Sequence, residues 1–156
     1  KKRNSLIMIN DVEIKVLTKI CDERGRIMHM LKSTDENFEK FGEIYFSTAY
    51  PGVVKGWHEH TKMTLNYSVI KGMIKLVLID NRENSSTYKK KQEICMGEHN
   101  YVLVKIPPKI INGFKNIGTQ ECIVANCSSI PHDKNEIIRY SPYNNAFDYN
   151  WDIVFK

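Results

Sequence analysis

The sequence predicts an all-β protein, a barrel or sandwich of short strands, and two observations support this prediction. Short apolar or alternating segments, separated by turn residues, recur along almost the whole of the 156-residue chain. Many short strands at such spacing are typical of antiparallel sandwiches and barrels. The length suits one domain with one sizeable core, so we expect residues 1–156 to form a single domain.

The expected strands follow from hydrophobic alternation. In residues 12–16, apolar positions alternate with charged ones, as in a strand with one buried face. A turn at residues 22–25 precedes the next strand, and Lys71 and Gly72 form a two-residue connection typical of a hairpin. The remaining predicted strands cover residues 26–31, 43–50, 53–58, 64–70, 73–80, 92–96, 101–106, 113–116 and 121–128.

Two segments depart from this strand pattern. Ser33 to Glu36 matches a capping box and Gly42 a C-terminal stop, which together predict one short helix near the N-terminus. The tail, residues 141–156, is rich in Tyr, Asn and Trp. We expect this tail to pack on the barrel or against a second subunit.

Composition limits the cellular setting. No apolar run reaches the roughly 18 residues that a membrane span needs. The start of the chain is basic, but the apolar stretch at residues 6–9 is shorter than the roughly 7–15 residues of a secretory signal. We therefore expect a cytoplasmic protein without a membrane partner. The four cysteines form no C-x-x-C pair and lie in apolar surroundings, which predicts buried, reduced thiols.

The net charge of +5 raises the question of an anionic partner. The basic residues are scattered, with one dense run from Lys89 to Lys91, and no nucleic-acid-binding module is recognisable. A cationic pocket for an anionic small molecule explains the surplus equally well. We therefore expect a small-molecule partner and no nucleic acid.

Two histidines one residue apart are the first candidates for a functional site. His58 and His60 lie on the same face of a predicted strand, because side chains alternate with a period of two. Their spacing and their flanking glycines match the first half of the cupin pattern, G-x5-H-x-H-x(3,4)-E-x6-G. The glutamate of this pattern is missing, and Asn112 stands at the third histidine position of its second half. The motif predicts a cupin-type jelly-roll β-barrel without a bound metal, because two imidazoles alone make a weak metal site.

Acid–base catalysis is the second use for these histidines. Imidazole titrates near neutral pH and is the usual group to remove a proton next to a carbonyl. His58 is the stronger candidate for the base, because Gly56 permits a bulge that turns both Lys55 and His58 inward. Polar positions of the next predicted strand, among them Asn66 and Ser68, either line the same cavity or lie outside it.

Several further motifs follow one another in a fixed order. Residues 22–25 (DERG) are similar to D-x-R-G, and residues 54–58 (VKGWH) to L-R-G-L-H. Residues 69–72 (VIKG) match V-V-R-G, residues 80–88 (DNRENSSTY) match D-x-R-x-x-S-P-T-F, and residues 106–114 resemble I-P-x-G-x-x-H-G-F. In this order and spacing the chain resembles the dTDP-4-dehydrorhamnose 3,5-epimerases and related nucleotide-sugar epimerases of the cupin superfamily.

This resemblance implies a function and roles for named residues. It implies an isomerase without a cofactor, which epimerises a nucleotide-linked 4-keto-6-deoxy sugar for surface-polysaccharide synthesis and works as a homodimer. His58 matches the family's base, which removes protons beside the ketone, and Lys55 matches a substrate-binding arginine. Arg24 matches an arginine that helps bind the nucleotide diphosphate, and dimerisation in the family brings such residues across the subunit boundary. His29 stands where the family has a glutamate of the site.

Other catalytic positions of the family are occupied differently. The acid tyrosine of the family aligns with Ala125, the second histidine with Asn112, and the lysine near the ketone with Leu65. The aspartate that orients the base falls near Ser141. The resemblance therefore leaves the acid, the orienting carboxylate and the enolate-stabilising cation to be found elsewhere in the chain.

Substitutes for these groups can be named. Tyr67, Lys62 and Lys75 are candidates to replace the missing acid or cation, and Asp148 is a candidate to orient His58 from the tail. Besides the catalytic His58, the residues expected to contact substrate are Arg24, His29, Lys55, His60, Asn66, Tyr67 and Asn112.

Three other functions stay open on these residues. A ketoisomerase acting on a similar substrate uses the same acid–base chemistry, and a metal-dependent cupin enzyme uses His58 and His60 as ligands. A non-catalytic cupin that binds a sugar nucleotide agrees with the lost tyrosine. The two histidines in turn-like segments, His99 and His132, are expected to face solvent.

Overall fold

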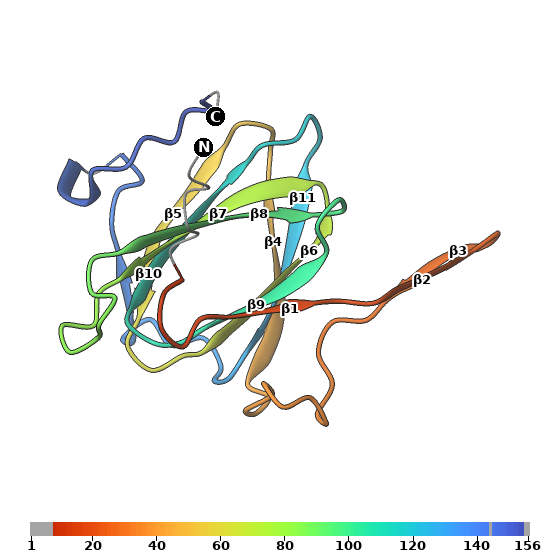
Figure 1. Ribbon diagram of the computed structural model, residues 1–156, viewed down its shortest axis with the longest axis horizontal. Helices are drawn as coiled ribbons and strands as arrows, with labels where there is room; N and C mark the ends of the chain where they lie inside the picture. The colour runs from red at the N-terminus through yellow and green to blue at the C-terminus, as the bar shows by residue number, and fades with distance from the viewer. Residues whose placement is uncertain (1–7, 144, 155–156) are drawn as a thin grey trace, which may run out of the picture.

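Two five-stranded antiparallel sheets face each other and enclose the core (Figure 1). The computed structural model describes residues 8–143 and 145–154. Most of the basic start and its apolar neighbours, on which the expectation about secretion rests, lie outside the described residues, as do residues 155–156 of the tail. The predicted all-β barrel of jelly-roll type is confirmed.

The strands have well-defined bounds and places. The first sheet contains, in spatial order, β1 (Glu13–Val16), β9 (Val102–Ile106), β6 (Leu65–Lys71), β11 (Cys122–Ser128) and β4 (Glu43–Ala49). The second contains β12 (Ile137–Arg139), β5 (Val54–His60), β10 (Ile110–Asn116), β7 (Met73–Asp80) and β8 (Lys91–Gly97). A separate hairpin is formed by β2 (Lys19–Asp22) and β3 (Gly25–Met28), and a 3₁₀ turn, η1 (Asn145–Phe147), lies in the tail.

The core lies between the two sheets, where the strands turn rows of apolar side chains inward. Enclosed members are Val69 of β6, Leu76 and Leu78 of β7, Met96 of β8 and Val104 of β9. Burial of such side chains stabilises the fold by about 1.5–3 kcal/mol each. Between β4 on one side and β5 with β12 on the other, the interior becomes polar, and a pocket opens there.

The connection at Gly72 is tight, but it is not the predicted hairpin. β6 and β7 belong to different sheets, so this turn carries the chain across the barrel. Gly72 has a φ of 82°, and a Cβ at this position would lie 3.1 Å from the Cβ of Cys122. Glycine therefore serves the corner for its conformation and for the close approach of β11.

The predicted short helix is absent, and residues 33–37 form consecutive turns instead. The Asp35 carboxylate accepts a hydrogen bond from the Lys32 amide (2.9 Å) and pairs with Lys15 (2.8 Å). The Phe38 amide donates to the Asp35 carbonyl at 3.0 Å, closing a four-residue turn. A segment this short does not repay helix nucleation, and the contacts of Asp35 hold its backbone in turns. No helix in the described part of the chain is long and apolar enough to cross a bilayer.

The C-terminal tail covers the outer face of the second sheet. The rings of Phe147, Tyr149 and Trp151 surround Trp57 of β5, with centroid separations of 5.5, 5.7 and 4.7 Å. Trp57 is fully buried and Trp151 almost so. This aromatic cluster fixes the outward-facing side of β5, and the alternate residues of that strand therefore face the interior.

The β2–β3 hairpin projects away from the barrel (Figure 1). At its tip the Arg24 side chain is 84% exposed and pairs with Asp22. Ile20 and Ile27 on the same hairpin are also exposed. Within one chain, Arg24 therefore lies far out on an arm and outside the pocket.

The four cysteines divide into two pairs by burial, so the expectation of four buried thiols is wrong for two of them. Cys122 and Cys127 of β11 are buried, whereas Cys21 and Cys95 are exposed, and all four are free. Cys21 is exposed because it lies on the projecting hairpin, which has no core beneath it.

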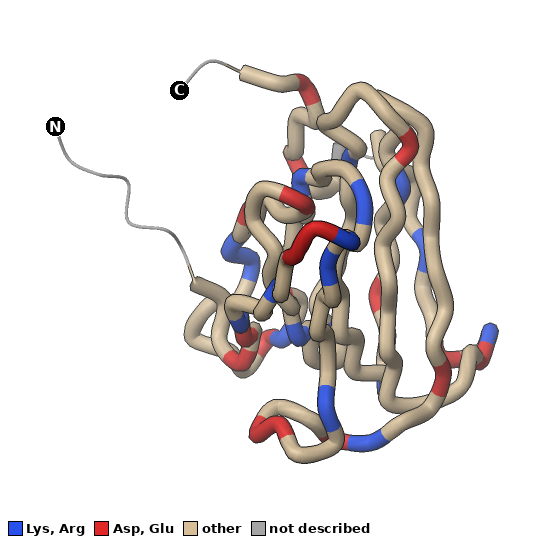
Figure 2. The backbone as a smooth tube through the Cα atoms, turned by 90° about the vertical axis from the view of Figure 1, so that its right-hand side faces the viewer, with Lys and Arg blue, Asp and Glu red and all other residues tan. Residues whose placement is uncertain are grey.

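Charged residues are interspersed over the molecule. Figure 2 shows basic and acidic segments alternating along strands and loops, without a stripe of one sign on the face that it presents. Several basic side chains are neutralised locally, for example Arg82 by Asp80 and Lys105 by Glu39. This distribution differs from the continuous basic surface that nucleic-acid binding requires.

Candidate active site

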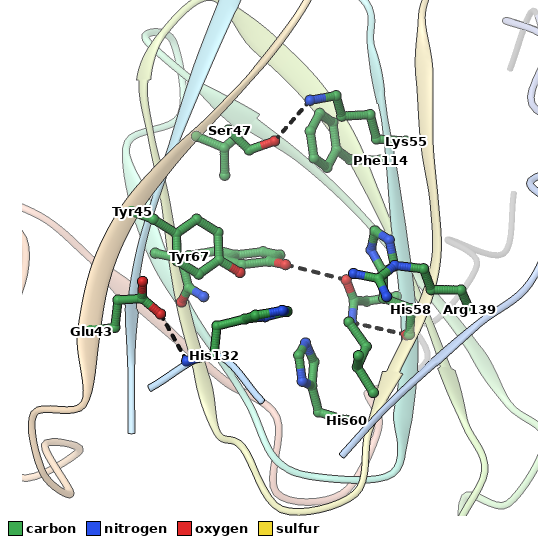
Figure 3. A pocket seen from close by; sticks show the side chains of 14 residues that line it. Glu43, Tyr45, Ser47, Lys55, His58, His60, Tyr67, Phe114, His132 and Arg139 are labelled. Atoms are coloured by element: carbon green, nitrogen blue, oxygen red, sulfur yellow. Dashed lines mark hydrogen bonds between the residues drawn. The ribbon is translucent and has the colours of Figure 1, made fainter. Parts of the chain in front are cut away.

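A cavity of about 390 Å³ opens between the two sheets. Its walls come from β4, β5, β6, β10, β11 and β12 and from the loop before β12 (Figure 3). The lining residues are Glu43, Tyr45, Ser47, Lys55, His58, His60, Tyr67, Asn112, Phe114, Val124, Asn126, His132, Ile137 and Arg139. The structure thus brings together five residues predicted for the site: Lys55, His58, His60, Tyr67 and Asn112.

A bulge in β5 turns Lys55 and His58 to the same side. Asn112 of β10 pairs with His58, and Phe114 pairs with Lys55. The two residues of β10 are two positions apart, whereas the two residues of β5 are three positions apart. The extra residue falls at Gly56, where a Cβ would lie 3.0 Å from the Cα of Gly113. The bulge expected at Gly56 is therefore present, and it places both side chains in the pocket.

His58 stands in the pocket as a neutral imidazole. Burial, together with the positive charges of Arg139, His60 and Lys55, lowers its pKa from 6.5 to about 4. Among the described residues no carboxylate is hydrogen-bonded to its ring. Asp148, the predicted orienting residue, lies instead beside Ile79 and Ile111 on the outer side of the second sheet, so that prediction is wrong.

His60 differs from His58, because its Nδ1 contacts the carboxylate of Glu136 directly. Both side chains are almost completely buried, with residue exposures of 5% and 3%. Burial raises the pKa of the Glu136 carboxyl, but the hydrogen bonds from His60 and from the amides of Lys62 and Met63 outweigh it and lower the pKa. Glu136 is therefore ionised at neutral pH and holds the imidazole of His60 in place.

The opposite wall of the pocket carries two phenols and an amide. Tyr67 of β6, Asn126 of β11 and Tyr45 of β4 stand in one row across three neighbouring strands. The Tyr67 hydroxyl donates to Oδ1 of Asn112 at 3.4 Å. Burial, and next the neighbouring Tyr45, raise the pKa of Tyr67, which therefore remains protonated and able to donate. The Asn126 Nδ2 atom is buried without a hydrogen-bond partner among the described residues.

Ala125 and Asn66 face away from this pocket. Register places Ala125 between Ser68 and Phe46, on the outer face of the first sheet, while Val124 and Asn126 point inward. Position 125 is thus not where a pocket tyrosine would stand in this chain.

Asn66 shares that outer face, because the inward position of β6 is taken by Tyr67. Its Nδ2 donates to the carbonyl of Cys127, and its neighbour across the sheet is Lys105. The alternative that this polar row lies outside the cavity is therefore correct, and Asn66 is not in the pocket.

The other predicted residues lie outside the pocket of their own chain. His29 follows the hairpin, its amide bonded to Thr18 and its carbonyl to the Tyr101 hydroxyl. Lys75 lies on the outer side, 5.3 Å from the Tyr149 ring centroid. With Arg24 on the hairpin, these residues cannot meet substrate in this cavity unless a second subunit supplies them.

Sequence reasoning missed several pocket residues. His99 is exposed as expected, whereas His132, also exposed, directs its ring into the pocket while its amide donates to Glu43 at 2.9 Å (Figure 3). Arg139 comes from β12, a strand of three residues without alternation. Tyr45 lies in the predicted strand 43–50, but its neighbours Ile44 and Phe46 are apolar and nevertheless exposed, so alternation alone would have turned Tyr45 outward.

A metal centre finds no support in the described residues. They contain no group of three His, Cys, Asp or Glu side chains able to hold an ion. His60, one of the two ligands proposed for such a centre, has its Nδ1 engaged by Glu136.

The two walls together offer a definite chemistry. Imidazoles and cations line one side, and neutral proton donors line the other. A base facing an acid across a bound carbon atom, with donors for a developing oxyanion, is what proton transfer next to a carbonyl requires.

Comparisons with known proteins agree with this chemistry. A sequence model of the family described as dTDP-4-dehydrorhamnose 3,5-epimerase matches residues 7–155. The probable low-salt glycan biosynthesis epimerase Agl13 of Haloferax volcanii is 32% identical over 93% of this chain and 97% of that protein. The spore coat polysaccharide biosynthesis protein SpsL of Bacillus subtilis is 28% identical over 96% of this chain and 100% of that protein.

A solved structure gives the same result. The dTDP sugar isomerase of Desulfovibrio desulfuricans G20 superposes with a TM-score of 0.89 at 36% sequence identity, over 92% of each chain. The resemblance inferred from the motifs is confirmed, and the chain belongs to the dTDP-4-dehydrorhamnose 3,5-epimerase family.

Proposed function

We propose that the protein epimerises a nucleotide-linked 4-keto-6-deoxy sugar in polysaccharide synthesis. The observation that carries this proposal is the pocket itself, in which His58 and His60 face Tyr45 and Tyr67 across a cavity of about 390 Å³. Membership of the family and the polysaccharide-related names of Agl13 and SpsL support the substrate class.

The reaction begins at the carbon next to the ketone. An imidazole of the β5 wall takes the proton from this carbon, and the electron pair of the C–H bond moves onto the ketone oxygen as an enolate. His58, which occupies the motif position, contacts the reacting part of the sugar. The Nδ2 atom of Asn126, which has no hydrogen-bond partner among the described residues, is placed to donate to an oxygen. A proton returned from a phenol on the opposite wall then gives the inverted configuration.

The diphosphate of the substrate meets the cationic part of the pocket. Lys55, whose Nζ is 3.1 Å from the Ser47 hydroxyl, and Arg139 line the same cavity. A lysine and an arginine are suitable partners for phosphate oxygens, the arginine with its fork of donors and the lysine as a point charge.

A homodimer is part of the proposal. The β2–β3 arm reaches beyond the barrel, and its exposed Ile20 and Ile27 lack a covering surface within the described residues. Ile44 and Phe46 are exposed on the outer face of β4, an edge strand. An arm docking on a partner would cover such apolar side chains and carry Arg24 to the partner's pocket.

We also place the protein in the cytoplasm. Cys21 and Cys95 are exposed, free thiols, and such thiols persist in reducing compartments. A cytoplasmic location agrees with an enzyme that uses a soluble nucleotide sugar.

Deuterium exchange tests the function. The protein is incubated with dTDP-4-keto-6-deoxyglucose in D₂O, and proton NMR follows the signals at C3 and C5. Loss of either signal, with formation of an epimer, is the expected result. Tight binding of the nucleotide sugar without exchange would instead show a binding protein, and a ketone moved to C3 would show a ketoisomerase.

A further inference from the structure

The buried pair formed by His60 and Glu136 is held by several hydrogen bonds next to the pocket. Oε1 of Glu136 contacts Nδ1 of His60, and Oε2 accepts the amides of Lys62 and Met63 at 3.1 and 3.2 Å. The Glu136 carbonyl accepts the Thr61 amide at 2.9 Å and the Thr61 hydroxyl at 3.1 Å. The chain that follows β5 thus clamps Glu136 by both its side chain and its backbone.

This clamp determines which ring nitrogen of His60 faces the substrate. With Nδ1 donating to the carboxylate, Nε2 is the nitrogen that carries the lone pair. Nε2 has no hydrogen-bond partner among the described residues, and the ring belongs to the pocket wall. Figure 3 shows this ring rising from the floor of the pocket beside the ring of His132.

The surroundings of His58 suit a different task. Cations and the other histidine surround it, and no carboxylate among the described residues stabilises its protonated form. A base is most effective when its conjugate acid has a pKa close to the working pH, and a pKa of about 4 leaves His58 a weak base. A neutral imidazole can still donate one hydrogen bond to a ketone oxygen.

We propose that the His60–Glu136 pair takes the proton from the sugar, with Glu136 as the positioning residue, and that His58 donates a hydrogen bond to the ketone oxygen. This division of roles rests on the proposed function. The C–H bond breaks, its proton goes to Nε2 of His60, and its electron pair goes to the ketone oxygen. The resulting imidazolium is stabilised by the ionised Glu136, which keeps its own charge as the aspartate of a catalytic triad does.

Proton return completes the cycle. The imidazolium of His60 gives the proton back on the same face, or a phenol of the opposite wall gives one on the other face. In the second case water reprotonates the phenolate, and the imidazolium of His60 releases its proton to water. The titratable and charged groups that line the pocket together with His60 are Glu43, Tyr45, Lys55, His58, Tyr67, His132 and Arg139.

The test compares Glu136→Gln with Glu59→Gln. Glu59 is also a buried, hydrogen-bonded carboxylate, but it lies on the outward side of β5, bonded to Asn81 and Tyr140. Glu136→Gln is expected to slow exchange at the sugar carbon by about 10²–10⁴-fold, with KM changed less than about threefold, and to move the acidic limb of the pH–rate profile. Glu59→Gln is expected to leave the exchange rate within about threefold of the original protein.

Results that overturn the inference are distinct from failure of the proposed function. If the original protein exchanges the proton, and Glu136→Gln keeps this rate within threefold with an unchanged pH profile, then His60 is not the base. No exchange by the original protein on any keto sugar refutes the proposed function instead.

Histidine ¹⁵N NMR examines the pair without substrate. His60 is expected to carry its proton on Nδ1, and Glu136→Gln is expected to change this tautomer. A His60 protonated on Nε2 alone contradicts the inference. Should Glu136→Gln fail to fold, Glu136→Asp replaces it, and an exchange rate equal to that of the original protein counts against the positioning role.

Discussion

The two walls of the pocket are built in different ways from similar strands. The β5 wall carries three inward side chains, Lys55, His58 and His60, because a bulge at Gly56 breaks the ordinary alternation. The facing wall shifts register between Ile123 and Val124 but is regular beyond them, and its row of Tyr45, Asn126 and Tyr67 crosses three strands. Bases are thus concentrated along one bulged strand, and proton donors are spread over one row of three neighbouring strands.

This difference determines which residues of each wall can take over a catalytic role from another. In a regular sheet, neighbouring strands place residues of one row within reach of the same substrate atom. A phenol can therefore come from β4 or β6 when β11 carries Val124 at its inward position. On the bulged strand each position is fixed by the backbone, so roles can pass only between the histidines that already face inward.

Of the variants that compare the two walls, removal of the phenols is expected to have the largest effect. The double variant Tyr45→Phe, Tyr67→Phe removes both phenols and is expected to slow formation of the epimer by about 10²–10³-fold. Deuterium exchange should fall much less, because the base wall is intact. Proton NMR measures both rates on one sample, and equal losses of both would contradict a division of labour between the walls.

A smaller effect is expected at the cationic part of the β5 wall. Lys55→Ala and Arg139→Ala each remove one contact to the diphosphate, which corresponds to about a tenfold rise in KM. The value of kcat should stay within about threefold. Steady-state kinetics measure this, with the exposed Lys71→Ala as a matched control. A fall in kcat at unchanged KM would place these cations at the reacting centre instead.

Two tyrosine insertions test the register of β11. In the background without Tyr45 and Tyr67, Val124→Tyr directs a phenol into the pocket and is expected to restore epimer formation by about tenfold. Ala125→Tyr points to the buried outer face, so it should restore nothing and should lower the free energy of unfolding by about 1–3 kcal/mol. Rescue by Ala125→Tyr would show that β11 has the opposite face inward.

The smallest effect concerns stability and pH. The pKa of His58 is about 4 in the folded protein and has its ordinary value of 6.5 in the unfolded chain. The unfolded chain therefore binds more protons between these two pH values. Stability is therefore lost as the pH falls from 6.5 towards 4. Replacing His58 with Gln removes the titrating group and should abolish about 1–2 kcal/mol of this loss. The figure is below the full value of the pKa shift because solvent screens a partly exposed ring.

Urea unfolding at pH 7 and at the acid end of this range measures the difference. His99→Gln, which changes an exposed histidine after β8, is the control. An identical loss of stability in His58→Gln and in the original protein would show that His58 does not stay neutral in the folded state.

Local patterns were sufficient for most strands and for part of the site. The alternation of apolar residues predicted the strands, and Gly56 predicted the bulge that brings Lys55 and His58 together. The capping pattern at Ser33 failed because the segment is too short to nucleate a helix, and because Asp35 within it is held by Lys15 of another segment. The turn at Gly72 was visible, but the sheet to which each flanking strand belongs depends on distant pairing.

The rest of the site depends on contacts that no local pattern contains. Glu136 lies 76 residues from His60 in sequence, in a loop without a strand or helix signal. Arg139 reaches the pocket because the short β12 pairs with β5 opposite His58. The family resemblance placed the missing tyrosine at Ala125, and only the register of β11 shows that this position faces outward.

The most direct test of the central claim is deuterium exchange in the double variant His58→Asn, His60→Asn. With dTDP-4-keto-6-deoxyglucose in D₂O, the original protein is expected to lose its C3 or C5 proton signal, while the variant, folded by circular dichroism and still binding dTDP, is expected to lose neither at a measurable rate. Exchange in the variant as fast as in the original protein would contradict proton abstraction by the histidines of β5.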